Sequence, residues 1–114
     1  MPINEWSDQI IIAEMNDEPA FADEIEALLR RVDDQAETGP DVIIDLKAVS
    51  YLNSSNLAQL LKLRKKMMLS KRRLRICSAT DSVWSVMLTT GLDSVFNFTE
   101  DVSTSLASLQ LGEP

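Results

Sequence analysis

The stretch of residues 41–77 constrains the fold more than any other part of the chain. Residues 42–44 form a short β-branched run that ends at Asp45, a pattern typical of a buried strand that meets a polar loop. Residues 54–68 carry apolar side chains at intervals of three and four, which predicts a helix, and residues 74–77 are predicted to form a second strand. Strand, helix and strand in this order favour a right-handed crossover between parallel strands. The apolar positions assigned to the helix are Leu57, Leu60, Leu61, Met67 and Met68.

The part of the chain before this unit alternates apolar runs with turn-forming residues. We expect a short edge strand over residues 3–6, a strand over residues 9–15 and a first helix over residues 21–32. Gly39 and Pro40 then stop the helical pattern.

The part after the unit continues the alternation. We expect a third helix with Asp81 as its N-cap and Gly91 at its end, then a strand over residues 95–98, then a terminal helix capped by Thr99. Trp84 in the third helix is compatible with a partner-binding anchor or with packing against the core, and we favour packing. The alternation as a whole predicts an α/β domain in which helices cover a mostly parallel sheet.

The composition excludes most catalytic chemistry. The 114 residues include no histidine, which removes the usual general base, the usual metal ligand and the common Ser/His and Cys/His nucleophile pairs. Cys77 is the only cysteine, so we expect a buried thiol and no zinc site. With three glycines there is no glycine-rich phosphate loop. We therefore expect a protein that is not an enzyme and that uses no cofactor and no metal.

The net charge of -7 hides a strong segregation of charge along the chain. Thirteen acidic residues fall at or before Asp45, none falls between residues 46 and 80, and eight of the eleven basic residues lie in residues 62–75. This pattern is compatible with an anionic partner or with the solvated face of a helix near the acidic first helix. We favour the solvated face, made by Lys62, Lys65, Lys66 and Lys71, and do not expect nucleic-acid binding, because no aromatic residues interleave with the basic ones.

The sequence predicts a cytoplasmic protein. Its first residues lack the basic and apolar segments of a signal peptide, and no run approaches the roughly 20 apolar residues of a membrane span. We therefore expect no insertion into a membrane. The oligomeric state stays open, because an amphipathic helix face covers a core and a dimer interface equally well.

Two motifs resemble those of a known family. The first is the series Val42, Ile43, Ile44, Asp45, Leu46, Val49, Tyr51, Leu52, Asn53, Ser54, Ser55, Asn56 and Leu57, and the second is Thr90, Gly91, Leu92 and Phe96. Both are similar to landmarks of STAS domains, the fold of bacterial anti-sigma factor antagonists. The resemblance implies a single STAS domain over residues 1–114, of the α/β class, with a mixed sheet, a parallel central part and about four helices packed chiefly on one side.

Ser54 has two interpretations. Short polar side chains such as Asn53, Ser54 and Ser55 are what a helix start needs for capping, and on the residues alone we favour that role. The resemblance implies instead that Ser54 is phosphorylated, with Ser55 as the fallback acceptor. Ser54 also lies at the end of the strands where parallel sheets bind ligands. Asp17, in the loop before the first helix, and Asp45 are candidate supporting residues at this end of the sheet.

The motif departs from the family pattern at two of its four positions. The family has Asp-Ser-Ser-Gly, where this chain has Asn53, Ser54, Ser55 and Asn56. Asn53 keeps the capping ability of aspartate but removes a negative charge beside Ser54. Asn56 adds a side chain where the family's glycine lets a partner come close. We expect these four residues to form the partner-binding site.

The resemblance implies a function in transcription regulation. We expect an anti-sigma factor antagonist that captures an anti-sigma factor with serine kinase activity, is switched by phosphorylation at Ser54, and is restored by a serine phosphatase. The alternative is a STAS subunit of another assembly, such as a lipid-transport ABC system, without phosphorylation. Asn53 and Asn56 are the residues that favour the alternative.

Overall fold

The computed structural model describes residues 3–34 and 39–112, and within them one five-stranded sheet carries the helices. The strands follow the order β1-β2-β3-β4-β5 across the sheet. The elements are β1 (Ile3–Ser7), β2 (Ile10–Glu14), α1 (Ala20–Asp34), β3 (Asp41–Asp45), α2 (Ser54–Leu69), β4 (Leu74–Cys77), α3 (Asp81–Thr90), the 3-10 helix η1 (Leu92–Ser94), β5 (Phe98–Thr99) and α4 (Val102–Gln110).

The sheet is mixed, with a parallel central part. β1 pairs with β2 in antiparallel fashion, whereas β2 with β3, β3 with β4 and β4 with β5 are parallel pairs. The central strands are almost fully buried because both of their faces are covered, which explains their continuous apolar runs. The predicted strand, helix and strand over residues 41–77 is confirmed as β3, α2 and β4, with the two strands parallel.

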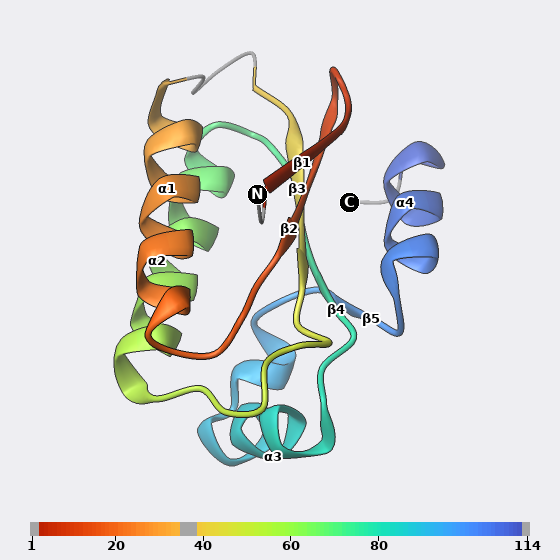
Figure 1. The fold of residues 1–114 in the computed structure, drawn as a ribbon. Coiled ribbons are helices and arrows are strands. Elements are labelled where there is room, and N and C mark those ends of the chain that lie inside the picture. The colour runs from red at the N-terminus through yellow and green to blue at the C-terminus, as the bar shows by residue number, and fades with distance from the viewer. Residues whose placement is uncertain (1–2, 35–38, 113–114) are drawn as a thin grey trace.

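Helices cover both faces of the sheet, but unequally. Figure 1 shows α1 and α2 side by side against one face, α3 at one end of the sheet and α4 alone on the other face. The main core joins the first three helices to the sheet, and a smaller apolar cluster lies under α4. The predicted α/β class and the mainly one-sided arrangement are therefore confirmed, with α4 as the exception. The smaller cluster is built from Ile10, Ile12, Ile43, Cys77 and Leu109.

The buried face of α2 differs from the predicted one. Leu61 is 38% exposed and Met68 is 57% exposed, whereas Leu63 is fully buried. A spacing of three or four is satisfied by two adjacent rows of a helix, and the row that faces the core runs through Leu57, Leu60, Leu63 and Met67. The prediction that Leu61 and Met68 lie on the same helix face as Leu57, Leu60 and Met67 is wrong, because the pattern allowed both rows.

The predicted limits of α3 are partly corrected. Its N-cap is Thr80, whose hydroxyl accepts a hydrogen bond from the amide of Val83, so Asp81 is the first helical residue and not the cap. The helix ends as predicted at Gly91, which has a φ of 76° in the left-handed region that favours glycine.

The segment after α3 also differs from the prediction. Residues 95–96 do not form a strand, because η1 follows α3 directly and β5 contains two residues only. Thr99 pairs with Cys77 in the sheet, so it does not cap α4. Asp101 is the N-cap of α4, and its carboxylate accepts from the amide of Thr104 at 2.8 Å.

Candidate functional site

The candidate site begins with a loop that two neighbouring elements hold in place. Residues 46–53 connect β3 to α2 at the carboxyl end of the strands. Asp17, in the connection between β2 and α1, accepts hydrogen bonds from the amide of Ser50 at 2.9 Å and from its hydroxyl at 2.7 Å. On the other side, the hydroxyl of Thr80 donates to the carbonyl of Val49 at 3.2 Å. The loop that leads into α2 is thus tied to α1's connection and to α3.

The two acidic residues predicted to support the site act on the loop. The bonds from Ser50 hold the pKa of Asp17 below its ordinary value, because they favour the charged carboxylate. Asp45 is buried and accepts from the amide of Lys47 at 3.0 Å, and the Lys47 ammonium lies 3.4 Å from its second oxygen. Both carboxylates therefore shape the backbone before α2.

Asn53 and Asn56 form a reciprocal cap at the start of α2. The amide of Asn56 donates to the side-chain oxygen of Asn53 at 2.8 Å, and the amide of Asn53 donates to the side-chain oxygen of Asn56 at 3.0 Å. This is the arrangement of a capping box, which satisfies two backbone groups at once. The two residues that depart from the family motif are therefore partners of each other.

The side chain of Asn56 points inward. Asn56 is 1% exposed, and its side-chain nitrogen is buried without a hydrogen-bond acceptor among the described residues. The expectation that Asn56 adds bulk where a partner approaches is corrected, because the capping bond to Asn53 turns the side chain into the protein. Sequence reasoning missed this pairing, although an Asn three residues after a polar N-cap is the available signal.

Ser54 and Ser55 occupy the first two positions of α2, and both are exposed. Neither is the cap, so the capping role expected for the serines belongs to Asn53. A helical amide normally donates to the carbonyl four residues earlier, but for Ser54 and Ser55 that residue lies before the helix. Both amides are therefore left without an intrahelical acceptor. No acidic residue lies in the first turn. The helix start therefore presents two hydroxyls, two backbone donors and the positive end of the helix dipole.

Exposed apolar side chains lie just before α2 and on α2 and α3. Tyr51, just before α2, is 64% exposed, and Leu61 follows Ser54 on the same helix. On α3, Leu88 is exposed and Trp84 is 37% exposed while its ring packs edge-on against Phe98 at 5.1 Å. The packing expected for Trp84 is therefore confirmed, although part of its ring stays accessible.

The family follows from a comparison with known domains. The model of the STAS domain family matches residues 7–105, most of the chain. The chain belongs to the STAS domain family. A sequence comparison with curated proteins gives no match.

Solved structures show the same fold at low sequence identity. This STAS domain is similar to an anti-sigma-factor antagonist (STAS) domain protein from Planctomyces limnophilus, with a TM-score of 0.78 and 18% identity over 95% of this chain and 96% of that chain. It is similar to RsbS of Moorella thermoacetica, with a TM-score of 0.76 and 17% identity over 96% of both chains. It is also similar to the Bacillus cell fate determinant SpoIIAA in its phosphorylated form, with a TM-score of 0.68 and 10% identity over 94% of this chain and 96% of that chain.

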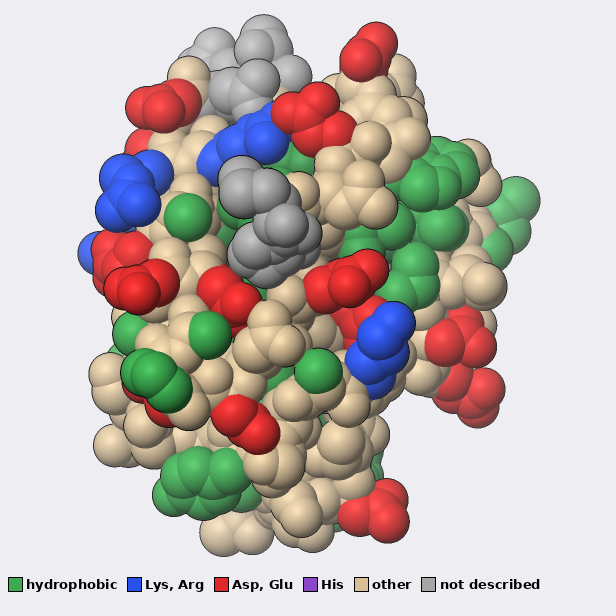
Figure 2. Space-filling model, in the orientation of Figure 1, with side chains coloured by type: hydrophobic (Ala, Val, Ile, Leu, Met, Phe, Trp, Pro, Cys, Tyr) green, Lys and Arg blue, Asp and Glu red, His purple; other side chains and the backbone are tan. Residues whose placement is uncertain are grey.

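In the basic stretch of this STAS domain most lysines are exposed, whereas the arginines are half-buried or buried. Lys62, Lys65 and Lys71 are exposed, and Lys66 lies 2.7 Å from Asp33 of α1, so the lysines form the expected solvated face near the acidic helix. The face of the molecule seen in Figure 2 instead carries many acidic side chains and few basic ones, with hydrophobic side chains over α4.

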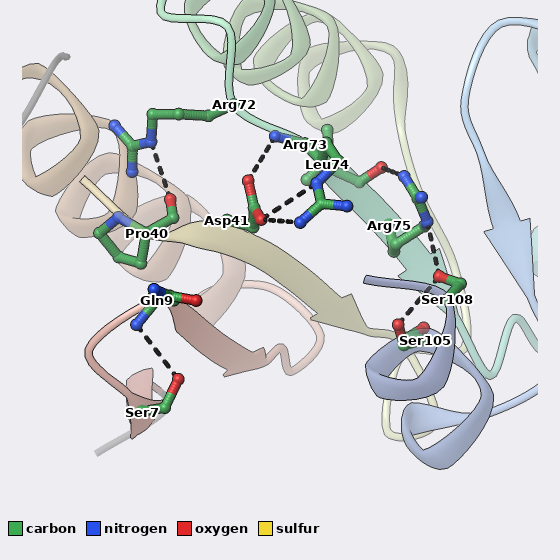
Figure 3. Close-up of polar contacts among 10 residues, drawn as sticks. All are labelled: Ser7, Gln9, Pro40, Asp41, Arg72, Arg73, Leu74, Arg75, Ser105 and Ser108. Carbon is green, nitrogen blue, oxygen red and sulfur yellow. Dashed lines mark hydrogen bonds and ion pairs between the residues drawn. The ribbon is translucent and has the colours of Figure 1, made fainter. Parts of the chain in front are cut away.

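The arginines have roles that sequence reasoning missed. Arg72 and Arg75 are buried. Arg72 donates to the carbonyl of Pro40 at 2.8 Å, and Arg73 binds Asp41 through its amide and its guanidinium (Figure 3). Together these contacts join the start of β4 to the start of β3.

Two kinds of feature are absent from the described part of the chain. No helix within residues 3–34 and 39–112 is long and apolar enough to cross a membrane. In the same part of the chain, no group of three or more His, Cys, Asp or Glu side chains could hold a metal ion.

Proposed function

We propose that this STAS domain is an anti-sigma factor antagonist: a binding module, not an enzyme, that captures an anti-sigma factor through the surface around Ser54. The observation that carries the proposal is the exposed pair Ser54 and Ser55 at the start of α2, on a loop fixed by Asp17 and Thr80. The structural similarity to STAS domain anti-sigma factor antagonists supports it. We also propose that residues 1–114 form a single STAS domain and that the protein acts in the cytoplasm.

Phosphorylation of Ser54 is the proposed switch. A phosphate carries about -1.5 to -2 charges at neutral pH, and the positive end of a helix dipole stabilises such a charge. The unbonded first-turn amides supply donors, and the absence of an acidic residue in that turn removes a source of repulsion. The SpoIIAA structure that this fold resembles is of a phosphorylated form. The partners are an anti-sigma factor with serine kinase activity and a serine phosphatase.

The capping box makes the proposed switch compatible with an unchanged fold. Asn53 and Asn56 hold the helix start through each other, so neither Ser54 nor Ser55 is needed to cap α2. A phosphate on Ser54 would then add charge and bulk to the surface while α2 stays helical. Because Asn56 is buried, we assign the direct contacts with the partner to Ser54 and Ser55. The half-buried Asn53 and the buried Asn56 position the two serines. Ser55 remains the second candidate acceptor.

Binding and structure must be measured on the same variants. Ser54→Glu is expected to weaken binding of the copurifying anti-sigma factor by about tenfold or more, because a charge would enter a docking surface of standard size. The amide NMR spectrum of Ser54→Glu should differ from that of the wild type only for residues around the start of α2.

Ser103→Glu is the matched control. Ser103 is also exposed in the first turn of a helix, α4, on the other face of the sheet, so the same charge there should leave affinity unchanged. Equal affinity of the wild type and Ser54→Glu for every copurifying partner would contradict the switch. A global change of the Ser54→Glu spectrum would contradict the proposal that the fold is kept.

One observation favours the alternative function. At the position of the family's aspartate, Asn53 uses its side-chain oxygen for the cap and offers no carboxylate to a kinase. A STAS subunit of another assembly, such as a lipid-transport ABC system, would need no phosphorylation. Copurification with permease and ATPase subunits, with Ser54 unmodified, would favour this alternative.

A further inference from the structure

A hollow of about 260 Å³ opens beside the far end of α2, away from Ser54. Three parts of the chain enclose it: the last two turns of α2, the start of β4, and residues 95–97 ahead of β5. Arg64, on the rim, is ten residues after Ser54, which is about 15 Å along the helix axis. The hollow is therefore separate from the proposed phosphorylation site.

The lining of this hollow is strongly basic. Its residues include Arg64, Arg72, Arg73 and Arg75, and none of the residues that line it is acidic. The sequence explains the charge, because residues 46–80 contain no aspartate or glutamate. The guanidinium of Arg72 turns to the carbonyl of Pro40, so the lining residue that is the candidate for a ligand contact is Arg64. A guanidinium matches the oxygen atoms of a phosphate with paired hydrogen bonds, which favours an anionic ligand.

The protein holds these guanidinium groups in place. Arg73 is fixed by Asp41, and Arg75 donates to the hydroxyl of Ser108 on α4 at 2.9 Å (Figure 3). Arg64 is half-buried and donates from Nε to the carbonyl of Val95 at 3.0 Å, an uncharged acceptor. Side chains fixed in this way lose little further freedom when a ligand binds.

We propose that the hollow between α2, β4 and residues 95–97 binds a small phosphate-bearing anion, with Arg64 as a direct ligand-binding residue. Its volume is below the 300 to 1,000 Å³ of typical drug-sized pockets, which favours a phosphate with at most a small organic group. The apolar part of the lining comes from Met67, Met68 and Phe96 and would contact that group.

The test is a titration of the ¹⁵N-labelled protein with sodium phosphate, followed by amide and Arg64 Nε signals, against sodium chloride at equal ionic strength. Phosphate is expected to give saturable shifts at Arg64, Leu74 and Asn97, and chloride is expected to give none. Shifts that follow ionic strength alone, or that gather at Ser54 and Ser55, would overturn the proposal.

Three variants locate the binding. Arg64→Gln should weaken phosphate binding by about tenfold, the size of one charge-assisted hydrogen bond, and Lys65→Gln on the exposed side of the same helix should change it less than about twofold. Asn97→Asp places a carboxylate on the rim without removing a side-chain contact, and it should also weaken binding. If Arg64→Gln and Lys65→Gln act equally, or if Asn97→Asp has no effect, the proposal fails.

A second arm identifies the source of the phosphate. Tighter binding of phenyl phosphate than of inorganic phosphate would support an organic phosphate that uses the apolar lining. Equal affinities would support free phosphate. If neither probe binds, the proposal is overturned.

Discussion

The two ends of α2 use polar residues in opposite ways. At its start, two uncharged asparagines cap the helix through each other and leave two serines exposed. Near its end, charged arginines are drawn into the protein and fixed by carbonyl oxygens and by one carboxylate, Asp41. The start can therefore accept a new charge without losing a structural contact, whereas the end depends on charges for its structure. This contrast explains why a switch fits at Ser54.

The largest expected effect comes from removing the ion pair between Asp41 and Arg73, near the end of α2. Asp41→Ala removes the acceptor of three hydrogen bonds from Arg73 and leaves a half-buried guanidinium without that ion pair. We expect the free energy of unfolding to fall by about 2–3 kcal/mol, reduced from the cost of a fully buried pair by solvent screening. Chemical denaturation measures the change.

The control for this variant is Asp33→Ala. It removes the more exposed pair between Asp33 of α1 and Lys66 of α2 and should cost less than about 1 kcal/mol. Equal costs for the two variants would mean that the arginine contacts are no more structural than a surface ion pair.

The next effect concerns the uncharged end. Asn53→Ala removes the side-chain half of the capping box and should lower the free energy of unfolding by about 1 kcal/mol. Ser54→Ala, one residue later, removes a hydroxyl from an exposed position and should change stability by less than about 0.5 kcal/mol. A larger cost for Ser54→Ala than for Asn53→Ala would reverse the assignment of the cap.

A smaller effect is expected when a negative charge is introduced at the start of α2. Asn53→Asp restores the family's aspartate and keeps a capping oxygen, and a carboxylate beside the helix start is favoured by the dipole. We expect a gain of about 0.3–1 kcal/mol at neutral pH and low salt, which should shrink as salt is added. A loss of stability at low salt would show that the side-chain amide of Asn53 is itself required.

The smallest effect is the pH dependence of the loop before α2. The pKa of Asp17 is lowered in the folded protein by its bonds from Ser50. Its contribution to stability is therefore present above the unfolded pKa, near 4, and is lost as the pH falls through the folded value. Asp17→Asn should flatten the acid side of the stability profile, measured by denaturation between pH 7 and pH 3. An unchanged slope would contradict the role of Asp17 as a charged acceptor.

Much of the fold could be predicted because its signals are local. The β-branched run at residues 42–44 and the left-handed Gly91 each determine an element or its end, and both predictions were confirmed. Helix caps were less predictable. Where several polar residues stand in a row, as at Thr80 and Asp81, the hydrogen bond that forms depends on the exact path of the backbone.

The site was predictable in its position but not in its contacts. The strand order places Ser54 at the carboxyl end of the sheet, as expected. The pairing of Asn53 with Asn56 was missed because the family comparison treats the two positions separately. The buried arginines were missed because charged residues are usually exposed, and only the folded chain brings Arg72 next to Pro40.

The measurement that tests the central claim most directly is phosphosite mapping by mass spectrometry on the protein purified from its own cells, together with the proteins that copurify. The account predicts a phosphate on Ser54 in a fraction of the molecules and a kinase-type anti-sigma factor bound to the unmodified fraction. An unmodified Ser54 under all growth conditions, in a protein that copurifies with a transport ATPase, would contradict it.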